Sequence, residues 1–238
     1  MKNTNKFYDN RIVQKPWGYE YTIFRNSNRV GITFLNINYK HKTSLHCHPK
    51  KKTGFIILKG EASVQLGLYS SNIKKYRSPS RLVIRPGLFH SIKAISKQGV
   101  CALEFETPVN KKDLVRFKDE YGRQSKPYEG IKYTKKIGSK LIKFKKPQKG
   151  KSQKYTFNNL EISLGIYSEF KSLIKKNDKT ISAILNGKIV DKMGQNVISH
   201  GEIVKTSTLK KLSEVFKIDK QLTILRVTKK KIKKNKYF

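Results

Sequence analysis

Three histidines are the residues in this chain whose types and spacing most clearly suggest chemistry. His46 and His48 are two positions apart, and His90 follows a Pro86-Gly87 turn. Residues i and i+2 of a β-strand point to the same face, so the first two imidazoles could chelate one ion. A closed antiparallel barrel would bring the third imidazole to them. Three neutral imidazoles leave coordination positions open for substrate, so the pattern predicts one divalent ion: Zn, Mn, Fe or Ni.

Two carboxylates could work beside such an ion. Glu104 and Glu106 lie at i and i+2 of an expected strand whose other face carries Cys101, Leu103 and Phe105. If those apolar side chains face a core between layers, the two glutamates point either into the barrel mouth or to solvent. Pointing inward, one could complete the metal shell and the other could act as a general base with a raised pKa. Both are therefore candidate catalytic residues.

Four further residues are candidates for binding a substrate. Lys50 and Lys52 follow the histidine pair and could clamp a phosphate, and Arg85 near His90 could contribute in the same way. Tyr19 could form a wall for a sugar ring. The alternatives are an ordinary solvated loop for the lysines and an ordinary core position for the aromatic ring.

The elements that must position these residues are predicted to be strands. Short runs rich in β-branched and aromatic residues, interrupted by Gly and Pro, are typical of a barrel or sandwich. We expect strands within residues 30–39, 54–66, 81–85, 100–107, 155–167, 180–190, 196–204 and 221–227. The Lys-rich stretch 135–154 is the expected linker between a barrel over residues 1–134 and a second unit over residues 155–238 with a basic tail.

A weak internal repeat supports two related units. The sequence ILKG at 57–60 matches ILNG at 184–187, and VIRPG at 83–87 matches VISHG at 197–201. No H-x-H precedes Gly187, and Val204 occupies the place of His90. The second unit is therefore expected to be a barrel without a metal.

The histidine motifs resemble those of a known superfamily, the cupins. The segments Ser44-Leu45-His46-Cys47-His48, then Gly60, then Arg85-Pro86-Gly87-Leu88-Phe89-His90 resemble the cupin motifs H-x-H with a later Glu and Gly, and P-x-G-x-x-H. The segment 15–20, KPWGYE, resembles the opening of the cupin domain in type II mannose-6-phosphate isomerases. The segment 106–123 is similar to cupin proteins encoded with surface-polysaccharide genes. The resemblance covers roughly residues 11–130 and implies an all-β fold, a double-stranded β-helix (cupin jelly roll) with two tandem barrels, the second degenerate.

Two departures from the cupin pattern affect the expected site. Thr53 stands near the position where the first motif has its Glu, and Ala94 stands where the second motif often has Asn. The resemblance then implies a metal held by three histidines alone unless another carboxylate substitutes.

The resemblance implies an isomerase or epimerase that moves a proton on a sugar phosphate or nucleotide sugar in surface-polysaccharide metabolism. Because one fold hosts many reactions, other functions stay open. Three histidines without a carboxylate also suit an Fe(II) cupin dioxygenase. A half-degenerate bicupin could instead bind a sugar without catalysis.

Composition limits the partners. The chain of 238 residues has a net charge of +37, with 53 basic and 16 acidic residues, but the charge is mostly Lys and spread along the chain. We therefore expect steering of anionic small molecules rather than nucleic-acid binding. Two cysteines, a polar N-terminus and the lack of a stretch of about 20 apolar residues indicate a cytoplasmic protein without membrane segments. Exposed barrel edges favour a homodimer.

Overall fold

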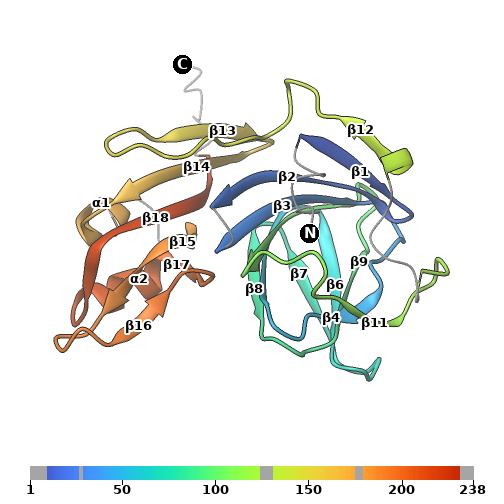
Figure 1. Cartoon of the computed structure of the whole chain (residues 1–238), viewed down its shortest axis with the longest axis horizontal. Helices are drawn as coiled ribbons and strands as arrows, with labels where there is room; N and C mark the ends of the chain where they lie inside the picture. Colours follow the sequence, from blue (N-terminus) through green and yellow to red (C-terminus); the bar gives the residue numbers. More distant parts are fainter. Residues whose placement is uncertain (1–9, 27–28, 124–130, 175–178, 231–238) are drawn as a thin grey trace, which may run out of the picture.

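The computed structural model describes residues 10–26, 29–123, 131–174 and 179–230. Its first half consists of two facing antiparallel sheets (Figure 1). The larger sheet has the order β12-β1-β2-β3-β10-β5-β8 and the smaller has the order β11-β4-β9-β6-β7. Their bounds are β1 Arg11–Lys15, β2 Gly18–Asn26, β3 Val30–Ile37, β4 Leu45–Cys47, β5 Lys52–Lys59, β6 Glu61–Leu66, β7 Ile73–Arg77, β8 Ser80–Ile84, β9 His90–Ala94, β10 Val100–Thr107, β11 Val115–Lys118 and β12 Thr134–Lys136.

The chain passes back and forth between these two sheets. From β3 to β10 it visits the larger sheet with β3, β5, β8 and β10, and the smaller sheet with β4, β6, β7 and β9. The two sheets are thereby wound together as one double-stranded β-helix, the jelly-roll arrangement. This winding is what places β4 beside β9 and β10 beside β5, although each pair is far apart in the sequence.

The inside of the first barrel is apolar at one end. Inward side chains of both sheets form one buried cluster there, including Trp17, Ile37, Ile57, Val64 and Ile92. Along β10 the inward residues change from Ala102 to Glu104 and Glu106, so the barrel interior becomes ionic toward its other end. The strands β3, β5 and β10 read as nearly continuous apolar runs because both of their faces are covered.

The second half forms one further antiparallel sheet in the order β13-β14-β18-β15-β16, with β17 paired to β15. Two helices pack on one face of it and enclose a cluster that includes Leu173, Ile184, Leu209 and Ile224. The bounds are β13 Gln153–Phe157, β14 Leu160–Tyr167, α1 Phe170–Ile174, β15 Ile181–Val190, β16 Asn196–Ser199, β17 Ile203–Lys205, α2 Thr206–Ser213 and β18 Lys217–Lys229; a short 3-10 helix spans Ile131–Tyr133.

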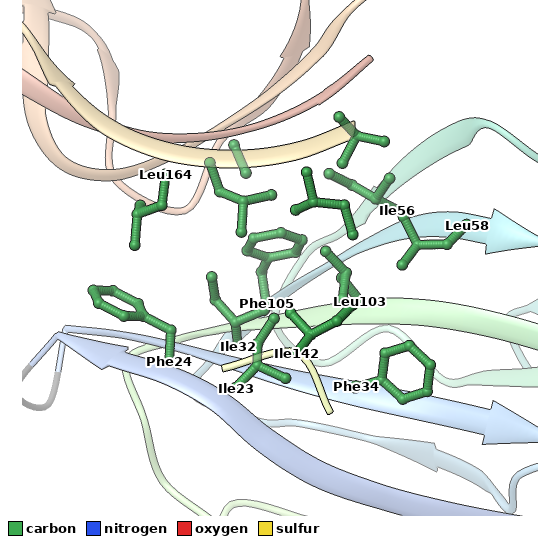
Figure 2. Packing of buried hydrophobic residues seen from close by; sticks show 14 of the residues in the cluster. Ile23, Phe24, Ile32, Phe34, Ile56, Leu58, Leu103, Phe105, Ile142 and Leu164 are labelled. Carbon is green, nitrogen blue, oxygen red and sulfur yellow. The ribbon is translucent and has the colours of Figure 1, made fainter. Parts of the chain in front are cut away.

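The two halves share a large apolar core. The outer face of the larger barrel sheet packs against the sheet of the second half. Figure 2 shows Leu164 of that sheet directed toward the layer that holds Phe24, Ile32 and Phe105. A hydrogen bond of 2.5 Å from Lys52 to Glu202 joins the same two halves at the edge of this core. Three layers of sheet are therefore packed together rather than connected only by the chain.

The all-β class and the double-stranded β-helix expected from the sequence are confirmed. The degenerate character of the second unit takes a specific form, because among its described residues two short helices lie where a second sheet would cover the first. The Lys-rich stretch 135–154 is attached to both halves: β12 at its start pairs with β1, Ile142 and Phe144 are buried in the shared core, and its last residues begin β13. No helix in the described part of the chain is long and apolar enough to cross a membrane.

Candidate metal centre

The three predicted histidines meet at the ionic end of the first barrel. His46 on β4 and His90 on β9 are direct cross-strand partners, and His48 follows at the end of β4. Their ring centroids are 4.5 Å apart for His46 and His90, 4.9 Å for His46 and His48, and 5.4 Å for His48 and His90. One ligand atom from each ring lies within 4.8 Å of the others, a spacing that one ion can bridge.

Backbone carbonyls fix which nitrogen each ring presents. The Nδ1 atoms of His46, His48 and His90 lie 2.8, 2.6 and 3.0 Å from the carbonyl oxygens of Ser44, Asp113 and Leu88. A carbonyl oxygen only accepts hydrogen bonds, so each Nδ1 carries the proton and donates it. The lone pair is then on Nε2, as in metal sites whose histidines are oriented by an outer hydrogen bond.

The freed nitrogens fit a metal ion. The Nε2 atoms of His48 and His90 are buried and have no hydrogen-bond partner among the described residues. A buried acceptor without a partner costs about 1–3 kcal/mol, a cost that a metal–nitrogen bond would remove. Imidazole nitrogen suits Zn, Cu, Fe and Ni, so the residues present fit a divalent transition metal.

Burial also keeps the three rings neutral. Burial, together with the Lys51 ammonium, lowers the pKa of His48 to about 3 and that of His90 to about 4. For His46, burial and the two neighbouring imidazoles hold the pKa well below its usual range. Neutral imidazole is the form that ligates a metal, so the cluster is ready to bind one at neutral pH.

The two glutamates of β10 point into the barrel and have different partners. Cys101, Leu103 and Phe105 on the opposite face belong to the core shared with the second half. Glu106 is held by two ammonium groups, Lys51 Nζ at 2.6 Å and Lys111 Nζ at 3.2 Å.

These partners separate the pKa values of the two carboxyls. Burial, together with the nearby charge of Glu106, raises the pKa of Glu104 to about 7. Burial would also raise the pKa of Glu106, but Lys111 and Lys51 outweigh it and hold that pKa well below its usual range. Near neutral pH, Glu106 is therefore a fixed anion, and Glu104 is the carboxyl able to exchange a proton.

One pocket collects the histidines, both glutamates and several cations. Trp17, Leu35, Phe55, Ile92 and Leu114 give it apolar walls. Its charged lining, beyond Glu104 and Glu106, consists of Lys15, Glu20, Lys51, Lys111, Arg116 and Arg123. Thr53 lies on β5 opposite Glu106, and its buried Oγ1 has no hydrogen-bond partner in the described residues. Thr53 replaces the Glu of the cupin motif, and the carboxylate on the neighbouring strand at this position is that of Glu106.

The four predicted substrate-binding residues do not line this pocket. Lys50 and Arg85 are exposed, and Lys52 pairs with Glu202 of the second half. Tyr19 stacks on Phe34, with ring centroids 6.4 Å apart, against the core between the halves. Strand alternation explains the difference, because Lys51, between the two proposed lysines, is the one that turns inward.

Sequence reasoning missed most of the charged lining. Lys111, Arg116 and Arg123 lie on and around β11, where nothing in the sequence indicates that the segment would cross the barrel mouth. Lys15 and Glu20 form an ion pair at 3.5 Å within the segment KPWGYE, which did give a signal through its resemblance to a cupin opening.

Two wound antiparallel sheets with an inward histidine triad define the first half as a double-stranded β-helix with a candidate metal centre. No protein-family profile matches the chain, and no curated protein matches it. Solved structures do match. The capsular polysaccharide assembling protein CapF from Staphylococcus aureus is 13% identical over 45% of this chain and 34% of its own, with a TM-score of 0.40. An uncharacterized double-stranded β-helix protein from Klebsiella pneumoniae is 13% identical over 42% of this chain and 79% of its own, with a TM-score of 0.38. KdgF from Halomonas is 12% identical over 40% of this chain and 84% of its own, with a TM-score of 0.35.

Proposed function

We propose that this protein is a metal-dependent enzyme that removes a proton from carbon in an anionic sugar derivative and returns one, to the neighbouring carbon as isomerases do or to the same carbon as epimerases do. One observation carries the proposal: the three histidines of the cluster line the same pocket as Glu104, a carboxyl whose pKa is raised to about 7. The expected substrates are sugar phosphates or nucleotide sugars. The surface-polysaccharide setting rests on the resemblance of segment 106–123 alone.

The Nε2 atoms of His46, His48 and His90 would hold the ion. A divalent ion bound there would polarise a carbonyl or hydroxyl oxygen of the substrate and so acidify the adjacent C–H bond. The backbone carbonyls that accept the Nδ1 protons keep the three rings aimed at one point, which limits the loss of rotational freedom on binding.

Glu104 would act as the base and then as the acid. In its ionised form the carboxylate takes the proton from the carbon next to the substrate carbonyl, and the electron pair of that C–H bond forms an enediolate. After exchange with solvent, the carboxylic acid gives a proton to the former carbonyl carbon, while the proton of the adjacent hydroxyl moves to the former carbonyl oxygen, so that the carbonyl group shifts by one carbon. A pKa of about 7 makes both forms available at neutral pH, which is the condition under which one group can serve both steps. Glu106, with each oxygen held by an ammonium group, fixes charge in the pocket rather than exchanging protons.

The charge of the pocket favours an anionic substrate. Five cationic side chains line it, namely Lys15, Lys51, Lys111, Arg116 and Arg123, against the carboxyls of Glu20, Glu104 and Glu106. A bound divalent ion would increase this excess. Field focusing in a cleft with low-dielectric walls would raise the local concentration of a phosphate-bearing ligand.

A second function is favoured by the ligand set itself. Within the described ranges, the metal cluster consists of three imidazoles and includes no carboxylate, a set that also suits Fe(II) and dioxygen chemistry. Consumption of oxygen by the iron-loaded protein with a catechol or thiol substrate would select this alternative. A sugar that binds and undergoes no exchange would select the non-catalytic bicupin.

The experiment has two parts. Elemental analysis of the purified protein should give about one divalent ion per chain, and His46→Ala/His48→Ala should lose it while keeping the far-UV circular dichroism of a β-protein. His41→Ala/His200→Ala is the matched control, since neither residue belongs to the cluster. Sugar phosphates and nucleotide sugars are then incubated with the protein in D₂O, and NMR is used to detect deuterium at carbon. Glu104→Gln should abolish the exchange. Metal-loaded protein that exchanges no substrate, or exchange that survives Glu104→Gln, would refute the proposed reaction.

A further inference from the structure

Asp113 contacts the site through both its main chain and its side chain. It lies in the loop between β10 and β11 and is buried, with 7% of its surface exposed. Its carbonyl oxygen accepts the Nδ1–H of His48 at 2.6 Å. Its carboxylate accepts the backbone N–H groups of Lys50 at 3.1 Å and Lys51 at 2.9 Å. One residue therefore connects a metal-ligand candidate to the start of the next strand.

The position of that carbonyl decides how His48 is presented. The carbonyls that hold His46 and His90 come from Ser44 and Leu88, each two residues away on the same segment, so local backbone geometry places them. His48 instead depends on a residue 65 positions later in the chain. Its orientation must be set by whatever keeps the loop in place.

The carboxylate of Asp113 is well suited to keep it there. Hydrogen bonds from two consecutive N–H groups to one buried carboxylate are charge-assisted and therefore stronger than neutral ones. The same loop is held from its other end, because Lys51 Nζ donates to the carbonyl of Asn110 at 3.1 Å and Lys111 pairs with Glu106. The loop is thus attached to residues 48–51 at two of its positions, Asn110 and Asp113.

We propose that Asp113 is a positioning residue for the metal centre: its carboxylate clamps the β10–β11 loop onto residues 50 and 51, so that its carbonyl fixes His48 with Nε2 toward the cluster. This proposal rests on the proposed function only where Zn²⁺ affinity is measured, because that measurement needs the metal site. The orientation of His48 is a property of the metal-free protein and is tested without any ion.

The test compares three variants of the full chain. Asp113→Ala removes the clamp, and Asp113→Asn keeps an oxygen that can accept the two N–H groups. Asp191→Ala is the matched control, because Asp191 accepts the N–H groups of Met193 and Gln195 in a turn of the second half that contacts no histidine. Zn²⁺ dissociation constants are measured by competition with a chromophoric chelator. The protonated nitrogen of each histidine is identified in metal-free protein by ¹⁵N-edited NMR.

In the wild type, His48 should carry its proton on Nδ1. Asp113→Ala should weaken Zn²⁺ binding roughly 10- to 100-fold, the usual cost of losing an outer hydrogen bond to a metal ligand, and should change the signals of His48 but not those of His90. Asp113→Asn should restore most of both, and Asp191→Ala should change neither. A wild-type His48 protonated on Nε2, equal effects of the two alanine variants, or an unchanged His48 in Asp113→Ala would overturn the proposal. Wild-type protein that binds no Zn²⁺ but shows the expected His48 signals refutes the metal site and leaves the clamp standing.

Discussion

His46 and His90 face each other directly across the β4–β9 pair, with their ring centroids 4.5 Å apart. Both Nδ1 atoms are occupied by carbonyls of their own segments, so the two rings present the same kind of nitrogen to the same space. The two rings therefore lie in position to bind one ion together.

The metal-free protein should lose stability in mild acid. Unfolded histidine has a pKa near 6.5, whereas His48 and His90 have values of about 3 and 4 in the folded state. Between these limits the unfolded chain binds more protons, so the free energy of unfolding should fall as pH decreases from about 6.5 toward 3, by several kcal/mol in all. Urea unfolding at a series of pH values measures this slope. His46→Ala/His48→Ala should flatten it, and an equal slope in that variant would show that other groups are responsible.

Glu104 should act in the opposite direction at higher pH. Its pKa is about 7 in the folded protein and near 4.5 when unfolded, so the folded state holds the proton more tightly. The resulting stabilisation is complete below pH 4.5 and is lost as pH rises through 7, amounting to at most about 3 kcal/mol. Glu104→Gln, which stays neutral, should therefore gain stability relative to the wild type between pH 5 and 8. Parallel stability curves for the two proteins would contradict the raised pKa.

Lys51 should be more costly to remove alone than together with its partner. The Lys51–Glu106 ion pair is almost fully buried, with 2% and 4% of the two side chains exposed. Lys51→Met leaves the Glu106 charge with Lys111 as its remaining close cation, and it should destabilise the protein by about 3–5 kcal/mol. Lys51→Met/Glu106→Leu should recover a large part of this loss. Additive effects in the double-mutant cycle would mean that the two groups do not interact.

The second half should be required for the stability of the first barrel. Leu164 is completely buried in the core that the halves share. Leu164→Ala should cost about 2–5 kcal/mol, and it should lower the stability of the whole chain in one transition. Removal of residues 150–238 should expose the outer face of the larger barrel sheet and increase binding of the dye ANS. A soluble fragment of residues 1–140 with wild-type stability would show that the halves are independent.

Local alternation and turns predicted the strands and the His46–His48 pair, whereas the double-stranded β-helix that brings His90 to the pair was implied by the resemblance to cupins. His46, His48 and the turn before His90 all lie in short motifs. The repeat also has a structural basis, since Gly60 and Gly187 both adopt positive φ where a Cβ would collide with a carbonyl oxygen, of Gly99 and Gln221 respectively.

The charged lining of the pocket could not be predicted in the same way. Whether Lys50, Lys51 or Lys52 turns inward depends on how β4 ends and β5 begins, which three consecutive lysines do not reveal. The roles of Lys111 and Asp113 depend on a loop that crosses the barrel mouth through contacts with residues more than 50 positions away. The core shared by the two halves could not be predicted either, because an apolar strand face does not indicate which other element will pack against it.

The change of the barrel interior from apolar to ionic along β10 has a kinetic consequence. The apolar end is filled by packed side chains, so in the proposed reaction a reactant would enter, and its product leave, at the ionic end, where Arg116 of β11 lines the pocket. Because reactant and product would share this route, the product would have to leave before the next reactant could enter. A molecule lingering there would act as a competitive inhibitor of the next turnover.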